Sequence, residues 1–286
     1  MLDLINKLLF LLISASLFGV DSAVTYEFSG GRFGDNLLSY LHAKWISYTH
    51  QIPVLYKPFP LSSELFLDGK EASYTHSQGR ARRHIGQGID SRRSYLYICP
   101  YFPEDEIEKA EYFYFDVDWE NEHFRAECLD LIAPKSSLQL IKLQENSINI
   151  AIHFREGGGF DHDDMKQKFP KKLPPLEFYT NGLAAVLKLL PDKPIYCHIF
   201  TDARVPQLIL GSFKAAFPTT QFGCRQGFNR YDRNVLEDFF SLFQFDILIR
   251  PQSNFSIIPS LLHDFAIVHT PYGTKINEPL YRRLFE

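Results

Sequence analysis

Polar turns follow four apolar, strand-like segments of this sequence, and they carry the side chains most suited to binding and chemistry. The turns are Gly30-Gly31-Arg32-Phe33-Gly34-Asp35-Asn36, His153-Phe154-Arg155-Glu156-Gly157, Phe200-Thr201-Asp202 and Gln252-Ser253-Asn254-Phe255-Ser256. Ligands of open α/β sheets bind at the carboxyl ends of strands. One shared binding site therefore explains these turns better than four coincidences do.

Arg155 has the clearest chemical meaning, because a guanidinium at a strand end offers a planar set of donors that matches a phosphate. The alternative is a structural ion pair, for which Glu156 is the nearest carboxylate. The glycines from Gly157 onward leave the next turn without side chains, so a ligand is the favoured partner. We therefore expect Arg155 to bind a phosphate group of a ligand.

The turn at Gly31 and Gly34 lies between a predicted strand and a predicted helix. Glycine lets backbone N–H groups approach a phosphate or sugar, and a helix N-terminus favours an anion. The spacing is not GxGxxG, so the fingerprint of dinucleotide binding is absent. A tight turn in which Asp35 or Asn36 caps the helix is the alternative. Ser253, Asn254 and Ser256 likewise predict either a helix cap or a phosphate site.

Two acidic clusters suggest metal binding. Asp116-Val117-Asp118 is similar to the DxD metal site of one glycosyltransferase fold, although this tripeptide is common. Asp161-His162-Asp163-Asp164 offers oxygen and imidazole ligands, but a solvated loop is the favoured interpretation. The four cysteines contain no CxxC pair, which argues against zinc and is compatible with one or two disulfides.

The elements that must position these residues alternate between strand-like and helix-like patterns. Strands are predicted at Val24–Phe28, Pro53–Tyr56, Tyr95–Cys99, Tyr112–Phe115, Asn149–Phe154, Tyr196–Thr201, Asp246–Arg250 and Ala266–His269. Helices are predicted at Asn36–Tyr48, Glu120–Ile132, Leu176–Leu190, Pro206–Phe217, Asn234–Phe243 and Ser256–His263. This alternation favours an α/β fold with parallel sheets. Long irregular stretches at Ser73–Arg93 and Gly157–Pro175 indicate functional or mobile loops.

The composition bounds the class of protein. The 286 residues are 45% hydrophobic and 15% aromatic, which excludes a disordered or fibrous chain. The net charge of −4 argues against nucleic acid as a partner and allows a local basic patch. Residues 1–23 resemble a signal peptide or membrane anchor, and a buried first helix is the alternative. We therefore expect a secreted or membrane-anchored protein of the secretory pathway, with lobes at 24–145 and 146–286.

Taken in this order, the motifs resemble those of the fucosyltransferase superfamily, which includes α1,2-, α1,6- and protein O-fucosyltransferases. The turn from Gly31 to Asn36 resembles the GRFGNQ opening of these enzymes, and the turn from His153 resembles their HxRxG motif. Thr201-Asp202 resembles their TDD strand end, and Asp246 followed by Ser253–Ser256 resembles their last motif. The resemblance extends from Val24 to about Pro259.

The resemblance implies a GT-B-like fold, with two Rossmann-like lobes whose parallel sheets face a cleft. It implies an inverting transfer of fucose from GDP-fucose to a glycan or protein hydroxyl, without a metal or other cofactor. Arg155 would hold the β-phosphate. The other residues expected to bind the nucleotide sugar are Gly31, Arg32, Gly34, Asn36, His153, Gly157, Asp202, Ser253, Asn254 and Ser256.

The general base that accepts the acceptor's proton stays open between two carboxylates. Asp35 stands where the family usually has Asn, and Asp163 lies where the α1,6 enzymes carry a carboxylate. Glu156 replaces the second Arg of some members. These departures keep in view an inactive relative that binds nucleotide sugar or glycan. The DxD tripeptide leaves open a metal-dependent transferase that uses Asp116 and Asp118.

Overall fold

The computed structural model describes residues 22–74, 81–90, 93–102, 116–157, 161–162, 164–227 and 229–285, which form two compact units. The first unit holds the described residues up to Gly31 and those of Asn36–Phe102 and Glu108–Ile132. The second unit holds Arg32–Asp35 and the described residues from Ala133 onward. In its first part, the Ile141 N–H donates to Ser241 Oγ at 2.9 Å.

The first unit is built on two small parallel sheets. One sheet has the order β1-β5-β4 and the other pairs β2 with β3. The strands are β1 (Ala23–Tyr26), β2 (Leu55–Tyr56), β3 (Ala72–Ser73), β4 (Ala81–His84) and β5 (Tyr95–Cys99). The helices are α2 (Phe33–His50), η1 (Ser62–Glu64), α3 (Leu67–Lys70), η2 (Ile85–Gln87) and α4 (Glu122–Ile132). The ring of Trp45 packs edge-on against Phe124 at 4.9 Å, which joins α2 to α4.

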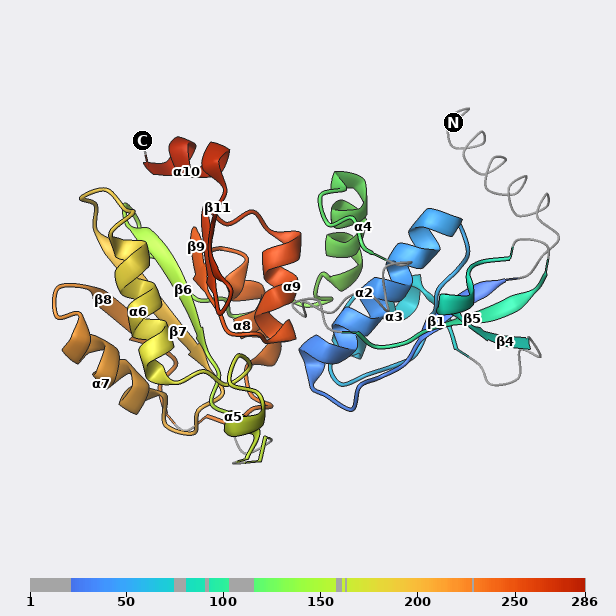
Figure 1. Cartoon of the computed structure of the whole chain (residues 1–286), viewed down its shortest axis with the longest axis horizontal. Helices are drawn as coiled ribbons and strands as arrows, with labels where there is room; N and C mark the ends of the chain where they lie inside the picture. The colour runs from blue at the N-terminus through green and yellow to red at the C-terminus, as the bar shows by residue number, and fades with distance from the viewer. Residues whose placement is uncertain are drawn as a thin grey trace. The chain divides into compact units, whose positions relative to one another are not determined.

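The second unit has a six-stranded sheet in the order β11-β10-β9-β6-β7-β8, parallel except for the β10–β11 pair. Its strands are β6 (Ile148–Phe154), β7 (Ile195–Thr201), β8 (Gln221–Cys224), β9 (Ile247–Ile249), β10 (Ile267–Thr270) and β11 (Gly273–Ile276). Its helices are α5 (Met165–Lys168), α6 (Leu176–Leu187), α7 (Pro206–Ala216), α8 (Val235–Leu242), α9 (Asn254–Leu262) and α10 (Glu278–Phe285) (Figure 1).

Hydrophobic layers cover both faces of this sheet, because successive side chains of a strand point to opposite sides. Ile150 and Ile152 of β6 pack with residues of α6, α7 and α10 in one cluster. Ala151, between them, packs with Leu242 of α8 and with the partly buried Phe255 of α9 in the other. Every residue of β6 is buried, as expected for the centre of a doubly covered parallel sheet.

Most predicted elements are confirmed within a few residues. The prediction of an irregular segment at Ser73–Arg93 is wrong for Ala81–His84, which forms β4. Strands β8 and β11 were not predicted, because both are four-residue edge strands that contain a glycine, and Gln221-Phe222-Gly223-Cys224 has no β-branched residue. The strand predicted at Tyr112–Phe115 lies outside the described residues.

Two further expectations concern cysteines and membranes. The four cysteines are free and buried, so none of the one or two disulfides that the sequence allows is formed. Burial raises the pKa of the thiols of Cys99, Cys128 and Cys197. Among the described helices, none is long and apolar enough to cross a membrane. Residues 1–21 lie outside the described part, so the leader stays a prediction.

Replacing Leu248 of β9 by Ala tests the core of the second unit. Because Leu248 is fully buried, the Leu248→Ala variant should lose about 2–5 kcal/mol of unfolding free energy through lost burial and a cavity. Leu208→Ala is the matched control, since Leu208 is 72% exposed and its truncation should cost no more than ~0.5 kcal/mol. Urea denaturation followed by circular dichroism measures both, and equal losses would contradict the assignment of the core.

Candidate functional site

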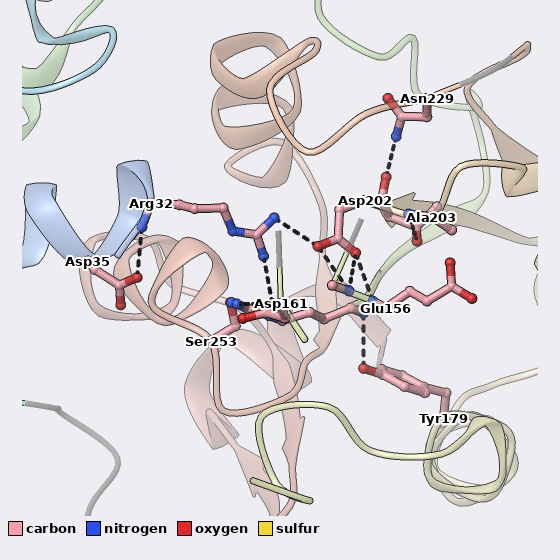
Figure 2. A network of polar contacts seen from close by, with 12 residues as sticks. Arg32, Asp35, Glu156, Asp161, Tyr179, Asp202, Ala203, Asn229 and Ser253 are labelled. Atoms are coloured by element: carbon pink, nitrogen blue, oxygen red, sulfur yellow. Dashed lines mark hydrogen bonds and ion pairs between the residues drawn. The ribbon is translucent and has the colours of Figure 1, made fainter. Parts of the chain in front are cut away.

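The candidate site lies in the second unit, at the carboxyl ends of β6, β7 and β9. Arg155 follows β6 directly, and Asp202 follows β7. Ser253 comes after β9 and is the N-cap of α9. The short segment Arg32–Asp35 belongs to the same unit and adds a second guanidinium. The structure thus brings residues of all four predicted turns together (Figure 2).

The guanidinium of Arg155 is buried and held from two sides. Its NH1 donates to Ser253 Oγ at 2.9 Å, and its NH2 donates to Asp161 Oδ2 at 2.7 Å. Its backbone N–H donates to the hydroxyl of Tyr179 in α6 at 3.2 Å. Glu156, the expected partner in the structural alternative, is exposed and does not pair with Arg155. Asp161 takes that place, so Arg155 is ion-paired through a residue outside the four turns.

Asp202 connects three segments of the site. Its Oδ1 accepts the Glu156 N–H at 2.7 Å and the Gly157 N–H at 3.2 Å, while its Oδ2 accepts Arg32 NH1 at 2.9 Å. Burial alone would raise the pKa of Asp202, but Arg32 and the Glu156 amide outweigh burial and lower it. Asp202 is therefore an anion at neutral pH, and it fixes the turn after β6 to the end of β7.

Asp161 lies between the two arginines. Its Oδ2 is 2.7 Å from Arg155 NH2 and 3.6 Å from Arg32 NH2, and its side chain is 5% exposed (Figure 2). A single carboxylate oxygen therefore occupies the place where an anion would meet both guanidiniums. The favoured interpretation of this acidic stretch as a solvated loop is wrong for Asp161, whose side chain is buried against the arginines, whereas Asp164 is exposed and pairs with Lys168 at 2.6 Å.

The glycine turn before α2 packs closely and caps the helix. Since α2 begins at Phe33, Asp35 lies in its first turn, and Asp35 Oδ2 accepts the Arg32 N–H at 3.1 Å, as in one half of a capping box. Asp35 Oδ1 accepts the amide of Asn254 at 2.6 Å. A Cβ on Gly34 would lie 2.5 Å from the Phe255 nitrogen. Gly34 therefore permits close contact, within the second unit, between the segment Arg32–Asp35 and the start of α9.

The polar side chains at the start of α9 hold other residues of the site instead of capping their own helix. Ser253 makes no side-chain cap bond and accepts from Arg155. Ser256 Oγ lies 2.7 Å from His153 Nδ1. Burial lowers the pKa of His153 to about 3, so this imidazole is neutral at pH 7 and adds no positive charge for an anion.

The remaining residues that were predicted for the site lie in different parts of the chain. Gly157, with φ of 105°, donates its N–H to Asp202. Gly31 and Asn36 belong to the first unit, where the Asn36 amide donates to the Gly31 carbonyl at 3.4 Å. Asp246 precedes β9, at the opposite end of the strand from the site, and its Oδ2 accepts the Asn149 N–H at 2.9 Å. It is a structural residue there. Asp163 lies outside the described residues.

The acidic pair Asp116 and Asp118 shows no metal-site geometry in the described residues. Asp118 Oδ1 accepts the Glu120 N–H at 3.1 Å, and this bond closes a turn just before α4. No group of three His, Cys, Asp or Glu side chains in the described part of the chain is arranged to hold a metal ion.

Sequence reasoning missed two residues of the site. Tyr179 lies in a helix far from any motif, and its hydroxyl meets Arg155 only through the packing of α6. The amide of Asn229 donates to the Thr201 carbonyl at 2.6 Å, at the end of β7.

Comparison with solved structures identifies the fold. A point mutant of Arabidopsis thaliana FUT1 in complex with GDP superimposes with a TM-score of 0.55 and 11% identity, covering 90% of this chain and 72% of that chain. The fucosyltransferase NodZ from Bradyrhizobium superimposes with a TM-score of 0.51 and 14% identity, covering 90% of this chain and 99% of that chain. No family model and no curated protein sequence matches this chain.

Replacing Gly34 by Ala tests the close contact between the segment Arg32–Asp35 and the start of α9. The added methyl group meets backbone atoms of Asn254 and Phe255, so Gly34→Ala should cost about 1–3 kcal/mol of unfolding free energy. Gly211→Ala in α7 is the matched control, because a Cβ there meets open space and should stabilise the helix by ~0.5–1 kcal/mol. Thermal unfolding distinguishes the two, and an unchanged Tm for Gly34→Ala would contradict the contact.

The similarity to the FUT1 and NodZ structures shows that the chain has the α/β fold of GT-B fucosyltransferases.

Proposed function

We propose that this chain is an inverting, metal-independent glycosyltransferase that transfers fucose from GDP-fucose to a hydroxyl group of a glycan or protein. The observation that carries the proposal is the pair of guanidiniums, Arg155 and Arg32, brought together at the carboxyl ends of parallel strands. The FUT1 structure with the same fold is a complex with GDP. Because one fold hosts many activities, the residues of the site carry the argument.

The chemistry asks for stabilised negative charge on the leaving group. As the acceptor oxygen bonds to the anomeric carbon, the bond from that carbon to the β-phosphate oxygen breaks, and its electron pair stays on GDP. A fixed guanidinium at that oxygen lowers the barrier, and losing such a donor costs about 10²–10³ in rate. Ser253 and Tyr179 hold Arg155 in place before the donor arrives, so the guanidinium needs little reorganisation.

A second function is favoured by one specific observation. Asp161 and Asp202 already neutralise the arginines, which suits a protein that binds sugars or nucleotides without turnover. Transfer and binding are distinguished by adding GDP-fucose and measuring released GDP with and without an acceptor glycan. Saturable GDP binding without any release of GDP from the donor would favour the binding protein.

Arg155→Lys tests the role of the guanidinium. Lysine keeps the charge but cannot reach Ser253 and Asp161 together, so the stabilisation by GDP should fall strongly. Arg230→Lys is the control, since Arg230 is exposed and pairs with Asp232. A thermal-shift panel of GDP, UDP, ADP and CDP with EDTA measures the effect. Selective stabilisation by GDP supports the proposal, whereas a preference for UDP that requires manganese would refute it.

Asp35→Asn and Asp163→Asn test the general base. If one carboxylate accepts the proton of the acceptor hydroxyl, its amide variant should lose about 10²–10⁴ in kcat while GDP binding is retained. Asp35 also accepts bonds from Arg32 and Asn254, so the Tm of Asp35→Asn separates a structural loss from a catalytic one. Full turnover in both variants would show that neither residue is the base.

A further inference from the structure

Both arginines of the site are paired with carboxylates, whereas the nearby cation Lys172 is not, among the described residues. Arg32 NH1 is 2.9 Å from Asp202, and Arg155 NH2 is 2.7 Å from Asp161, so carboxylates already hold both guanidiniums. In the part of the chain that the structure describes, the ammonium of Lys172 has no hydrogen bond or ion pair. An incoming anion therefore meets two neutralised arginines and one lysine whose charge is not matched.

The backbone ties Lys172 to the site. The N–H groups of Lys172 and Leu173 both donate to the Phe169 carbonyl at 3.0 Å, which closes a turn after α5, and Leu173 is buried. The carbonyl of Lys171 accepts the Gln252 N–H at 2.8 Å. Because Gln252 directly precedes Ser253, which holds Arg155, the segment that carries Lys172 is attached to the turn that positions the arginine.

The charges of the site act on Lys172. Partial burial, and after it the neighbouring Arg155, lower the pKa of Lys172, while Asp35 and Asp161 act in the opposite direction and Arg32 adds to the lowering. The ammonium thus lies in the combined field of both arginines and two of the carboxylates. A partly buried ammonium without a counterion is costly, and a bound anion would remove that cost.

We propose that Lys172 is a binding residue for the diphosphate of the donor, and that its ammonium supplies the positive charge that Asp161 and Asp202 withdraw from the arginines. This inference rests on the proposed function and adds to it a residue that no motif of the sequence contains. A flexible ammonium suits this role, because it is a point charge that reaches a phosphate oxygen without the fixed geometry of a guanidinium.

Lys172→Met tests the proposal by removing the charge and keeping the aliphatic length. Lys171→Met is the matched control, since Lys171 is the exposed neighbour and its ammonium lies 4.3 Å from the ring centre of Tyr272. Isothermal titration of each variant with GDP, GMP and guanosine measures the affinity. A bond to a charged group corresponds to about ten-fold or more in affinity. GDP binding should therefore weaken by that factor in Lys172→Met, GMP binding by less, and guanosine binding should be unchanged.

The outcomes separate this inference from the proposed function. If the unmodified protein binds GDP and both variants bind it equally well, Lys172 is not a diphosphate residue. If Lys172→Met weakens the binding of guanosine as much as the binding of GDP, the lysine only shapes the pocket and the proposal is overturned. If the unmodified protein does not bind GDP, the proposed function fails, and titration with inorganic pyrophosphate decides whether Lys172 still binds a diphosphate. Thermal unfolding of Lys172→Met confirms that the variant is folded.

Discussion

The ion pairs of Asp202 and Asp161 with the two arginines are the interactions on which the rest of the site depends. Asp202 accepts the backbone amides of Glu156 and Gly157, so it sets the path of the chain after β6. The same carboxylate binds Arg32, which comes from a segment 170 residues earlier. Removing one partner from such a partly desolvated pair would leave an uncompensated charge, which is why these contacts constrain all the segments they join.

The polar residues of α9 and the first turn of α2 act as a second set of constraints. Asn254 bonds to Asp35, Ser253 bonds to Arg155, and Ser256 lies against His153. Their close approach requires a residue without a Cβ at position 34. Several residues that were expected to bind the nucleotide sugar therefore also hold the segments of the site together.

Charge balance connects this architecture with the proposed function. A net charge of −4 for the whole chain says little about a site in which two arginines pair with two carboxylates. A binding site for a diphosphate needs a positive charge that is not already matched. Lys172 meets that requirement because its backbone is held in place while its ammonium has no partner among the described residues.

Parts of the fold and of the site follow from local patterns. The continuous apolar run of β6 predicts a central buried strand, and the polar residues after it predict a site at its carboxyl end. The same reasoning placed Arg155, Asp202 and Ser253 together, because the ends of parallel strands meet at one edge of a sheet. It missed β8 and β11, which are four-residue edge strands that contain a glycine and are held in the sheet by pairing with β7 and β10.

The sequence by itself determined most of the central strands and long helices, which turns are polar and which family they resemble, because these depend on residue types and short spacings. Only the tertiary structure decided which partner each polar side chain has. Arg155 pairs with Asp161 and not with the adjacent Glu156, and Asp246 supports the far end of β9 instead of the site. Such choices depend on distances between segments far apart in the chain, and a carboxylate's partner is set by which guanidinium the packed sheet and helices bring within reach.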